Sequence, residues 1–382
     1  MRMTPYGRQS IGQDDIAAVV RVMKGAFLTQ GFTVEAFENA LCQYTGARYC
    51  VAVANGTAAL HLAVSALNIK AGSSGVTSPI TFLASANALV YCGIKPLFAD
   101  IDPQTINMSP LALKRVIRKD TKLFIPVHFA GRPAAMQEIA AIARTRKCYV
   151  IEDAAHAIGS CYPDGGRVGN CAYSDMTIFS FHPVKTITTG EGGAIMTNNR
   201  ALYEALKRLR SHGVTRDPLL IKKSPGPWYY EMQDLGFNYR LTDIQAALGL
   251  TQLKKIDRFI QRRGKIVAAY NSAFRDLSWV VPVSVDDPYV VYHLYVVRLQ
   301  FARIGLERRE VMFRLAQAGV GSQVHYIPVY RHPFYQERDG VNDRSFSEAE
   351  RYYAECLSLP LFPAMKPADV KRCIKAVRSL VM

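Results

Sequence analysis

Residues 180–193 read SFHPVKTITTGEGG and give the strongest signal in the sequence. They begin at the end of an apolar run, Met176–Phe181, and their glycine-rich turn leads into a second run, Ala194–Thr197. Lys185 lies between the two runs, on a loop that is rich in threonine. Burial of a lysine at the carboxyl end of a strand disfavours its charged form, and the neutral amine can form a Schiff base. Lys185 is therefore a candidate catalytic residue, with an ordinary surface lysine as the alternative interpretation.

Short apolar runs alternate with helical patterns through the rest of the first half. The sequence predicts five further strands at Tyr49–Ala54, Gly75–Ser78, Pro96–Ala99, Leu123–Val127 and Cys148–Glu152. It predicts helices at Thr57–Asn68, Leu83–Tyr91, Pro110–Lys119, Met136–Arg146 and Ala201–Ser211. This alternation indicates an α/β fold, a mostly parallel sheet with helices on both faces. Ligands of such sheets bind beyond the carboxyl ends of the strands, so candidate site residues are sought there.

The pattern changes after residues 225–227, which read Pro-Gly-Pro. The second half predicts a long helix at Thr242–Phe274, a strand at His293–Leu299, a helix at Arg308–Ala318 and a strand at Gly321–His325. We therefore expect a large domain over residues 1–245. A smaller C-terminal α/β domain, which the long helix enters, would cover residues 246–382.

Composition and charge narrow the class of protein. The chain has 382 residues, of which 49% are hydrophobic and 20% are charged, so a disordered or fibrous chain is excluded. Lys and Arg number 47 and Asp and Glu number 31, which gives a net charge of +16 and favours partners that carry phosphate. The sequence has no run of five like charges and no tract of interleaved basic and aromatic residues. We therefore expect no nucleic-acid partner, and a nucleic-acid-binding protein is the competing hypothesis from another class.

The cysteines and the uncharged stretches indicate the compartment. None of the eight cysteines has the spacing of a zinc site, so we expect no metal, and several lie in apolar runs as reduced thiols do. The first 15 residues contain no apolar signal segment. Two uncharged stretches, residues 49–69 and 71–94, are interrupted by turn residues, so neither predicts a membrane span. We expect a cytoplasmic protein with no membrane partner.

Asp153 and His156 follow another predicted strand end. An acid at the end of an apolar strand needs a partner, and a pyridinium nitrogen fits because the carboxylate keeps that nitrogen protonated. A helix N-cap is the alternative role for Asp153. His156 is either a satisfied core histidine or a donor to the phenolic oxygen of the same cofactor.

Two further strand ends complete the candidate pocket. The turn Asn55-Gly56-Thr57 joins a strand to a helix, where free backbone N–H groups and the helix dipole form an anion site. Phe82 follows the next strand and either stacks on a flat ring or packs in the core. An anion cradle, a stacking aromatic, an acid and a lysine together indicate a pocket for pyridoxal 5'-phosphate (PLP).

These residues resemble those of the DegT/DnrJ/EryC/StrS family of sugar aminotransferases. The resemblance covers essentially the whole chain and is carried by Phe27–Gly31, Asn55–Thr57, Thr81-Phe82, Glu152-Asp153, Ser180–Gly193 and Gly236–Leu241. It implies fold type I of the PLP-dependent transferases, with a mostly parallel central sheet and a smaller C-terminal α/β domain.

The resemblance also implies roles for the matching residues. Lys185 would bind PLP covalently and carry protons, while Asp153 would pair with the pyridine nitrogen. Phe82 would stack on the ring, and the phosphate would be held by Gly56, Thr57 and Ser180. Asn238 would reach the phosphate of the neighbouring subunit, so a homodimer with shared active sites is implied. Positions near the nucleotide sugar match Tyr6, Ala26, Phe27, Leu28, Thr29, His325, Tyr326, Ile327 and Pro328.

Within the family, other segments are most similar to enzymes of pseudaminic acid biosynthesis. These segments are Pro5–Gln9, Phe129–Gly131, Gly226–Glu231 and Val324–Val329. They imply transfer of the amino group of L-glutamate to the C4 keto group of a UDP-linked sugar, UDP-2-acetamido-2,6-dideoxy-β-L-arabino-hex-4-ulose. One departure concerns the cradle, where Ala54 and Ala58 replace two serines that the family often carries. One branch of the family has histidine in place of the lysine and dehydrates sugars, so Lys185 favours transamination.

Two alternatives keep the cofactor and change the substrate. The acceptor could be another nucleotide-linked keto sugar, with dTDP or GDP in place of UDP. An amino-acid-specific PLP enzyme is the second alternative. Such an enzyme needs an arginine for the substrate carboxylate, and Arg240 and Arg298 are the candidates.

Overall fold

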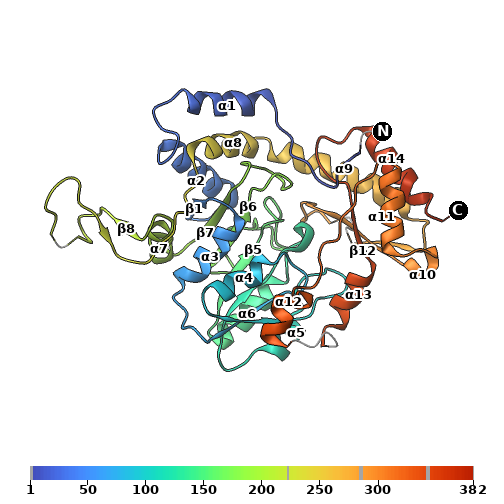
Figure 1. The fold of residues 1–382 in the computed structure, drawn as a ribbon, viewed down its shortest axis with the longest axis horizontal. Coiled ribbons are helices and arrows are strands. Elements are labelled where there is room, and N and C mark those ends of the chain that lie inside the picture. Colours follow the sequence, from blue (N-terminus) through green and yellow to red (C-terminus); the bar gives the residue numbers. More distant parts are fainter. Residues whose placement is uncertain (1–2, 222, 284–286, 341–344, 382) are drawn as a thin grey trace.

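A seven-stranded sheet forms the centre of the molecule (Figure 1). The computed structural model describes residues 3–221, 223–283, 287–340 and 345–381. The strands are β1 (Tyr49–Val53), β2 (Ser74–Thr77), β3 (Lys95–Phe98), β4 (Thr121–Ile125), β5 (Tyr149–Asp153), β6 (Met176–Ser180) and β7 (Gly193–Thr197). Their order is β1-β7-β6-β5-β4-β2-β3, and β7 alone runs antiparallel to its neighbours. The predicted α/β fold with a mostly parallel sheet is confirmed, and all seven predicted strands are present within two residues of their expected ends.

Helices cover both faces of this sheet. One apolar cluster joins the sheet to α3 (Gly56–Ala66), α4 (Ala84–Tyr91) and α7 (Arg200–Arg210). A second cluster on the opposite face joins it to α2 (Phe32–Thr45), α5 (Pro110–Val116), α6 (Met136–Arg146) and α8 (Asp243–Leu253). Successive residues of a strand point to opposite faces, so Val51 packs in the first cluster and Ala52 in the second. Burial on both faces explains why these strands are continuous apolar runs.

The predicted long helix at Thr242–Phe274 is instead two helices. It divides at Lys254 and Lys255 into α8 and α9 (Ile256–Phe274). Lys255 has φ −103° and ψ 0°, and its Nζ pairs with Asp14 at 2.9 Å and Asp15 at 2.5 Å. Both acids belong to α1 (Gln13–Met23), which packs along α8. The break is therefore a tertiary feature that helical periodicity does not reveal.

The predicted strand at Gly321–His325 is wrong. Only Gln323 pairs there, as a single bridge to Ser358 of β12 (Cys356–Leu359). The N–H of Gly321 donates instead to the carbonyl of Thr4 at 2.8 Å, so the ladder does not extend. The predicted strand at His293–Leu299 begins two residues later, as β11 (Tyr295–Leu299).

The C-terminal part forms a smaller layered unit. Its three-stranded antiparallel sheet has the order β10-β11-β12, where β10 is Val280–Pro282. A separate apolar cluster packs this sheet against α9, α11 (Arg308–Gln317) and α14 (Pro367–Arg378). Three shorter helices complete it: α10 (Phe301–Ile304), α12 (Pro333–Asp339) and α13 (Ser347–Glu355). The N-terminal residues lie with this unit, because Thr4 bridges to Val320 (Figure 1).

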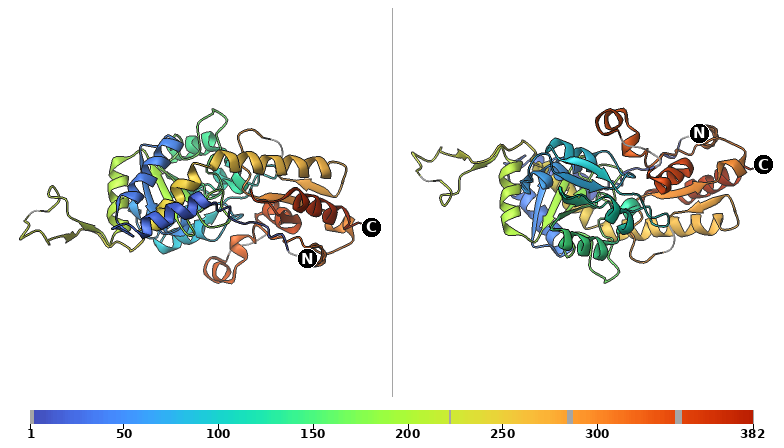
Figure 2. Two further views of the ribbon diagram at one scale, coloured as in Figure 1. Left: turned by 90° about the horizontal axis from the view of Figure 1, so that it is seen from above. Right: turned by 90° about the horizontal axis from the view of Figure 1, so that it is seen from below.

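A long arm projects from the opposite end of the molecule, as both views of Figure 2 show. It follows α7 and contains the two-stranded sheet of β8 (Val214–Thr215) and β9 (Glu231–Met232). Apolar side chains on the arm are strongly exposed: Leu219 is 92% exposed and Leu235 is 81% exposed. These two leucine side chains therefore have little contact with the rest of the described chain.

Candidate active site

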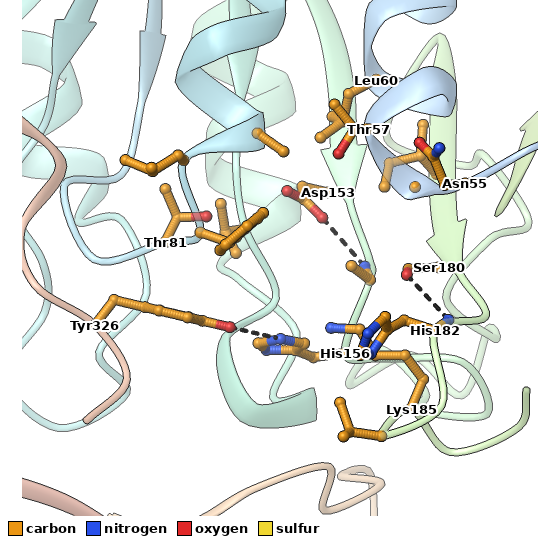
Figure 3. A pocket seen from close by; sticks show the side chains of 18 of the residues that line it. Asn55, Thr57, Leu60, Thr81, Asp153, His156, Ser180, His182, Lys185 and Tyr326 are labelled. Atoms are coloured by element: carbon orange, nitrogen blue, oxygen red, sulfur yellow. Dashed lines mark hydrogen bonds between the residues drawn. The ribbon is translucent and has the colours of Figure 1, made fainter. Parts of the chain in front are cut away.

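A cavity of about 1030 Å³ lies at the carboxyl ends of the central strands. The structure brings eleven of the predicted site residues together in its lining: Tyr6, Gly56, Thr57, Phe82, Asp153, His156, Ser180, Lys185, His325, Tyr326 and Ile327. Figure 3 labels six of them, which converge from different elements. Strand ends that are distant in the sequence thus supply one site, as the parallel topology predicts.

Lys185 projects from the loop that follows β6 (Figure 3). Its backbone N–H donates to the carbonyl of His182 at 2.9 Å, and the hydroxyl of Thr188 donates to the carbonyl of Phe181 at 2.9 Å. These bonds hold the loop against the strand end. Desolvation lowers the pKa of Lys185 to about 8, although the nearby carboxylate of Asp153 raises it. The amine is therefore deprotonated far more readily than that of an exposed lysine.

Asp153 ends β5 and is buried. Its Oδ2 accepts a hydrogen bond from the Ser85 hydroxyl at 2.6 Å, and its Oδ1 accepts one from the N–H of Ala155 at 3.2 Å. These donors orient the carboxylate while leaving lone pairs toward the cavity. The residues directly after Asp153 form turns and no helix, so the alternative role as a helix N-cap is wrong.

The start of α3 forms the anion cradle. Asn55 caps the helix, since its Oδ1 accepts from the N–H of Ala58 at 2.8 Å. The N–H groups of Gly56 and Thr57 precede the first intrahelical bond and are available to an anion. A Cβ on Gly56 would lie 2.9 Å from the Cβ of Ser180, so only glycine permits this approach of helix and strand. The side-chain hydroxyls of Thr57 and Ser180 also line the cavity.

Phe82 supplies an aromatic surface in the same cavity. It is 59% exposed, and its ring centroid lies 6.3 Å from that of Tyr326. An aromatic side chain left open inside a cavity is available for stacking on a planar ligand. A phosphate cradle, an oriented carboxylate, a deprotonatable lysine and an aromatic face are the groups that PLP requires, so the residues present fit this cofactor.

The sugar-side residues fall into two groups. Tyr6 reaches the cavity because Thr4 bonds to residues 319 and 321, and its ring lies 5.4 Å from that of His325. Five predicted residues lie outside the lining and on the exposed surface of the single chain: Ala26, Phe27, Leu28, Thr29 and Asn238. Pro328 also lies outside the lining. The surface group includes Asn238, which the family resemblance assigns to the neighbouring subunit.

Sequence reasoning missed several residues of the lining, among them His61, Tyr239 and His293. His61 and Tyr239 bond to each other at 3.3 Å. The ring of His293 lies 4.3 Å from that of His156. Tyr239 lies within the recognised segment Gly236–Leu241, and His293 begins a predicted strand, but local patterns do not reveal which cavity a side chain enters.

The fold and the site define the class of protein: an α/β enzyme whose cavity fits PLP. A model of the DegT/DnrJ/EryC1/StrS aminotransferase family matches residues 9–378. The chain belongs to this family and is a PLP-dependent sugar aminotransferase.

Individual relatives are similar along nearly their whole length. The chain is 38% identical to a UDP-4-amino-4,6-dideoxy-N-acetyl-beta-L-altrosamine transaminase of Campylobacter jejuni, over 97% of this chain and 95% of the relative. It is also 38% identical to the spore coat polysaccharide biosynthesis protein SpsC of Bacillus subtilis, over 99% and 97%. A solved structure of Helicobacter pylori PseC, an aminotransferase involved in the biosynthesis of pseudoaminic acid, superposes with a TM-score of 0.93. The two are 29% identical, and the match covers 100% of this chain and 99% of PseC.

The described residues contain neither a candidate membrane-spanning helix nor a candidate metal cluster. No helix among the described residues is both long and apolar enough to cross a membrane. Within the same residues, no group of three or more His, Cys, Asp or Glu side chains is arranged to hold a metal ion.

Proposed function

We propose that this enzyme transfers the amino group of L-glutamate to the C4 keto group of a UDP-linked 4-keto-6-deoxy N-acetyl sugar, as in pseudaminic acid biosynthesis. The observation that carries the reaction type is Lys185, a lysine with a lowered pKa facing Asp153 in a cavity with a phosphate cradle. The nucleotide and the sugar are supported by the similarity to the Campylobacter jejuni transaminase and to PseC.

Each pocket residue has a task in this reaction. PLP, when bound, supplies an electron sink for the carbon atom that loses a proton. Lys185 would hold the cofactor covalently, Asp153 would hold its pyridinium nitrogen, and the start of α3 would hold its phosphate. The freed Nζ of Lys185 would take a proton from Cα of glutamate and deliver one to C4 of the sugar. A pKa near 8 suits both directions, because the amine can accept and return a proton near neutral pH.

The positions of Arg240 and Arg298 do not support the alternative of an amino-acid-specific PLP enzyme. Arg298 pairs with Glu355 at 2.7 Å, at the end of the smaller sheet. Arg240 is not among the residues that line the cavity. The lining within the described chain contains no arginine, so neither candidate is available there to hold the carboxylate of an amino-acid acceptor.

A homodimer is part of the proposal. Exposed apolar side chains lie on the arm and near residues 26–32, where Phe32 is 81% exposed. Burying such surface against a second copy would stabilise the pair, because exposed apolar patches of this kind are typical of interfaces. Asn238 and residues 26–29 would then reach the partner's cavity. A cytoplasmic location is also proposed, since all eight cysteines are free.

A two-step spectroscopic experiment tests the function. L-Glutamate first converts the bound cofactor to its pyridoxamine form, and the glutamate is then removed. Addition of the UDP-linked keto sugar should restore the visible absorption band, whereas the dTDP and GDP 4-keto sugars should not. Restoration by one of those sugars instead would preserve the reaction type and contradict the proposed substrate. The same outcome would favour the alternative nucleotide sugar.

A further inference from the structure

Two hydroxyl groups in series end on the carboxylate of Asp153. The hydroxyl of Ser85 lies 2.6 Å from Oδ2 of Asp153, and the hydroxyl of Thr81 lies 2.8 Å from the Ser85 oxygen. Thr81 follows β2 and Ser85 lies in the first turn of α4, whereas Asp153 ends β5, 68 residues beyond Ser85. Thr81 and Asp153 line the cavity (Figure 3). The two bonds therefore tie one strand end of the site to another.

The three side chains of this series are withdrawn from solvent. Ser85 is 0% exposed, Thr81 is 3% exposed and Asp153 is 5% exposed. A hydrogen bond to a carboxylate is stronger in such surroundings than in water, and solvent does not replace it when it is lost. Each bond therefore has a larger effect on Asp153 than the same bond would have at the surface.

The carboxylate fixes the direction of both bonds. An ionised carboxylate only accepts, so the Ser85 hydroxyl donates its single proton to Asp153. The carbonyl of Phe82, which is 3.5 Å from the same hydroxyl, is the more distant acceptor. The Ser85 oxygen can then only accept from Thr81, so the Thr81 hydroxyl is the donor of the outer bond. Because successive hydrogen bonds polarise one another, the outer bond strengthens the inner one.

The backbone of Asp153 is held independently of these hydroxyls. Its N–H donates to the carbonyl of Pro126 at 2.9 Å, and its carbonyl accepts from the N–H of His128 at 3.0 Å. The rotation of the carboxylate is what these bonds leave free. The N–H of Ala155 donates to Oδ1 at 3.2 Å, whereas the Ser85 hydroxyl donates to Oδ2 at 2.6 Å. Ser85 is thus the closer of the two donors that set the orientation of the carboxylate.

The outer bond also closes the turn that carries Phe82. Thr81 and Ser85 lie on either side of Phe82 in the sequence, and the N–H of Ser85 donates to the carbonyl of Phe82 at 3.3 Å. The Phe82 side chain lines the same cavity as Asp153. One pair of hydroxyls therefore supports both an acid and an aromatic ring of the site.

We propose that the hydroxyl pair of Thr81 and Ser85 positions Asp153 to hold the ring nitrogen of the cofactor. The same pair fixes the turn of Phe82, so the acid and the aromatic ring meet the cofactor from one shared support. The inference rests on the proposed function, because it takes Asp153 as the partner of the pyridinium nitrogen. A carboxylate that is already oriented and kept ionised accepts from that nitrogen without prior reorganisation. Thr81 and Ser85 act through Asp153 and Phe82, which makes them positioning residues.

Binding of PLP to the cofactor-free protein tests the pair without any sugar. Ser85→Ala removes the inner donor, and we expect the Kd for PLP to rise at least about tenfold, the size of one hydrogen bond to a charged group. Thr81→Val keeps the shape but removes the outer donor, so the rise should be about two- to threefold. Thr81→Ser keeps the hydroxyl and should restore the wild-type Kd. Fluorescence titration measures these affinities, and the circular dichroism of the visible cofactor band, which reports the orientation of the bound ring, should weaken in the same order.

A double substitution tests whether the two hydroxyls act in series. Without the Ser85 hydroxyl the outer bond cannot form, so adding Thr81→Val to Ser85→Ala should raise the Kd for PLP no further. Rises that multiply in the double variant would show that Thr81 acts on its own and would overturn the series. An unchanged Kd and an unchanged circular dichroism in Ser85→Ala would also overturn it.

Ser74→Ala is the matched control. It breaks another buried hydroxyl pair, Ser74 with Thr121 at 2.9 Å, at the first residues of β2 and β4 and outside the cavity lining. The Kd for PLP should keep its wild-type value in this variant. A rise equal to that in Ser85→Ala would show a general defect of the fold and overturn the positioning role.

Asp153→Asn separates this inference from the proposed function. The variant has no charge to hold the pyridinium nitrogen, so we expect the Kd for PLP to rise at least as far as in Ser85→Ala. An unchanged Kd in Asp153→Asn would contradict the proposed role of Asp153 and overturn the inference with it. A raised Kd in Asp153→Asn together with a wild-type Kd in Ser85→Ala would overturn the inference alone.

Discussion

At the scale of single residues, the proposed reaction depends most on Lys185. Replacing it with alanine removes both the Schiff-base amine and the proton carrier. We expect Lys185→Ala to lower turnover by at least about 10²–10⁴-fold, the contribution of a positioned acid–base group, while PLP still binds through the cradle and Asp153. Steady-state kinetics and equilibrium dialysis with PLP measure the two effects. Normal turnover in this variant would contradict the assignment, and Lys185→Arg provides a control that keeps the charge.

The lowered pKa of Lys185 predicts a pH dependence for cofactor loading. Only the neutral amine attacks the aldehyde of PLP, so the loading rate should rise with pH as the ammonium loses its proton. Because desolvation brings the pKa of Lys185 to about 8, we expect the midpoint near pH 8. Stopped-flow absorbance of the cofactor-free protein mixed with PLP measures this profile. A midpoint near pH 10.5, the ordinary pKa of lysine, would show that the amine is not desolvated.

The charged residues of the candidate site were the part of the site that the sequence predicted best. Lys185 and Asp153 were identified because a charged residue at the end of an apolar strand is conspicuous in one dimension. His293 and Tyr239 were missed because their segments carry no such contrast. Their entry into the cavity depends on how the smaller unit and the segment after β9 pack on the sheet, which local patterns do not encode.

At the scale of elements, the phosphate cradle between β1 and α3 requires glycine at position 56. In Gly56→Ala the new Cβ would meet Ser180 at 2.9 Å, so the helix start must move away from the strand. We expect the Kd for PLP to rise on the order of tenfold, since a shift of the donors weakens at least one charge-assisted hydrogen bond. Fluorescence titration of the cofactor-free protein measures the affinity.

The same substitution at a glycine with open space around it serves as the control. Gly264 lies inside α9, and a Cβ there meets nothing within 4 Å. Gly264→Ala should leave the PLP affinity unchanged and stabilise the protein by about 1 kcal/mol, because alanine favours the helix. Equal loss of PLP affinity in both variants would show that the effect at Gly56 is not specific to the cradle.

A buried carboxylate beside the site ties several elements together. Glu152 of β5 accepts hydrogen bonds from His128 at 2.8 Å, Tyr162 at 2.6 Å and Ser174 at 2.5 Å. Burial alone would raise the pKa of Glu152, but these bonds outweigh it and lower the pKa below the ordinary value. Since the folded pKa lies below the unfolded one, the stabilisation is present above the unfolded pKa and is lost as pH falls through the folded pKa.

Glu152→Gln tests this arrangement. We expect the free energy of unfolding at pH 7 to fall by about 3 kcal/mol, because one buried partner loses its charge, and the difference to wild type to shrink in acid. Urea unfolding at pH 7 and pH 4 measures both. Glu348→Gln, which affects only a surface pair with Arg351, should change stability by less than about 1 kcal/mol. A constant difference between pH 7 and pH 4 would contradict the role of the Glu152 charge.

Element boundaries show where local patterns stop being informative. The strands β1–β7 were predictable because burial on both faces leaves apolar runs with turn residues between them. The break between α8 and α9 at Lys254-Lys255 could not be predicted, because apolar periodicity continues through it. Its cause is the pairing of Lys255 with Asp14 and Asp15, which lie about 240 residues away in the sequence. The division into residues 1–245 and 246–382 stays a prediction, and α8 packs on α1 and α2 of the large unit.

At the scale of the whole molecule, the exposed arm predicts association. Light scattering should give twice the chain mass of 42.5 kDa for wild-type protein. Leu235→Asp places a charge on the arm where an apolar contact is expected, so the monomer fraction should rise and PLP affinity should fall as Asn238 loses its place. Leu111→Asp, at an exposed leucine of α5, is the matched control and should leave the mass unchanged. A monomeric wild-type enzyme with full activity would contradict the shared active site.

The most direct test of the central claim follows the nitrogen atom itself. The enzyme is incubated with L-[15N]glutamate and the UDP-linked 4-keto-6-deoxy N-acetyl sugar, and the nucleotide sugar is analysed by mass spectrometry and NMR. The account predicts one 15N atom attached to C4 of the sugar, with 2-oxoglutarate formed in equal amount. Formation of 2-oxoglutarate without 15N in the sugar, or recovery of a dehydrated sugar, would contradict it.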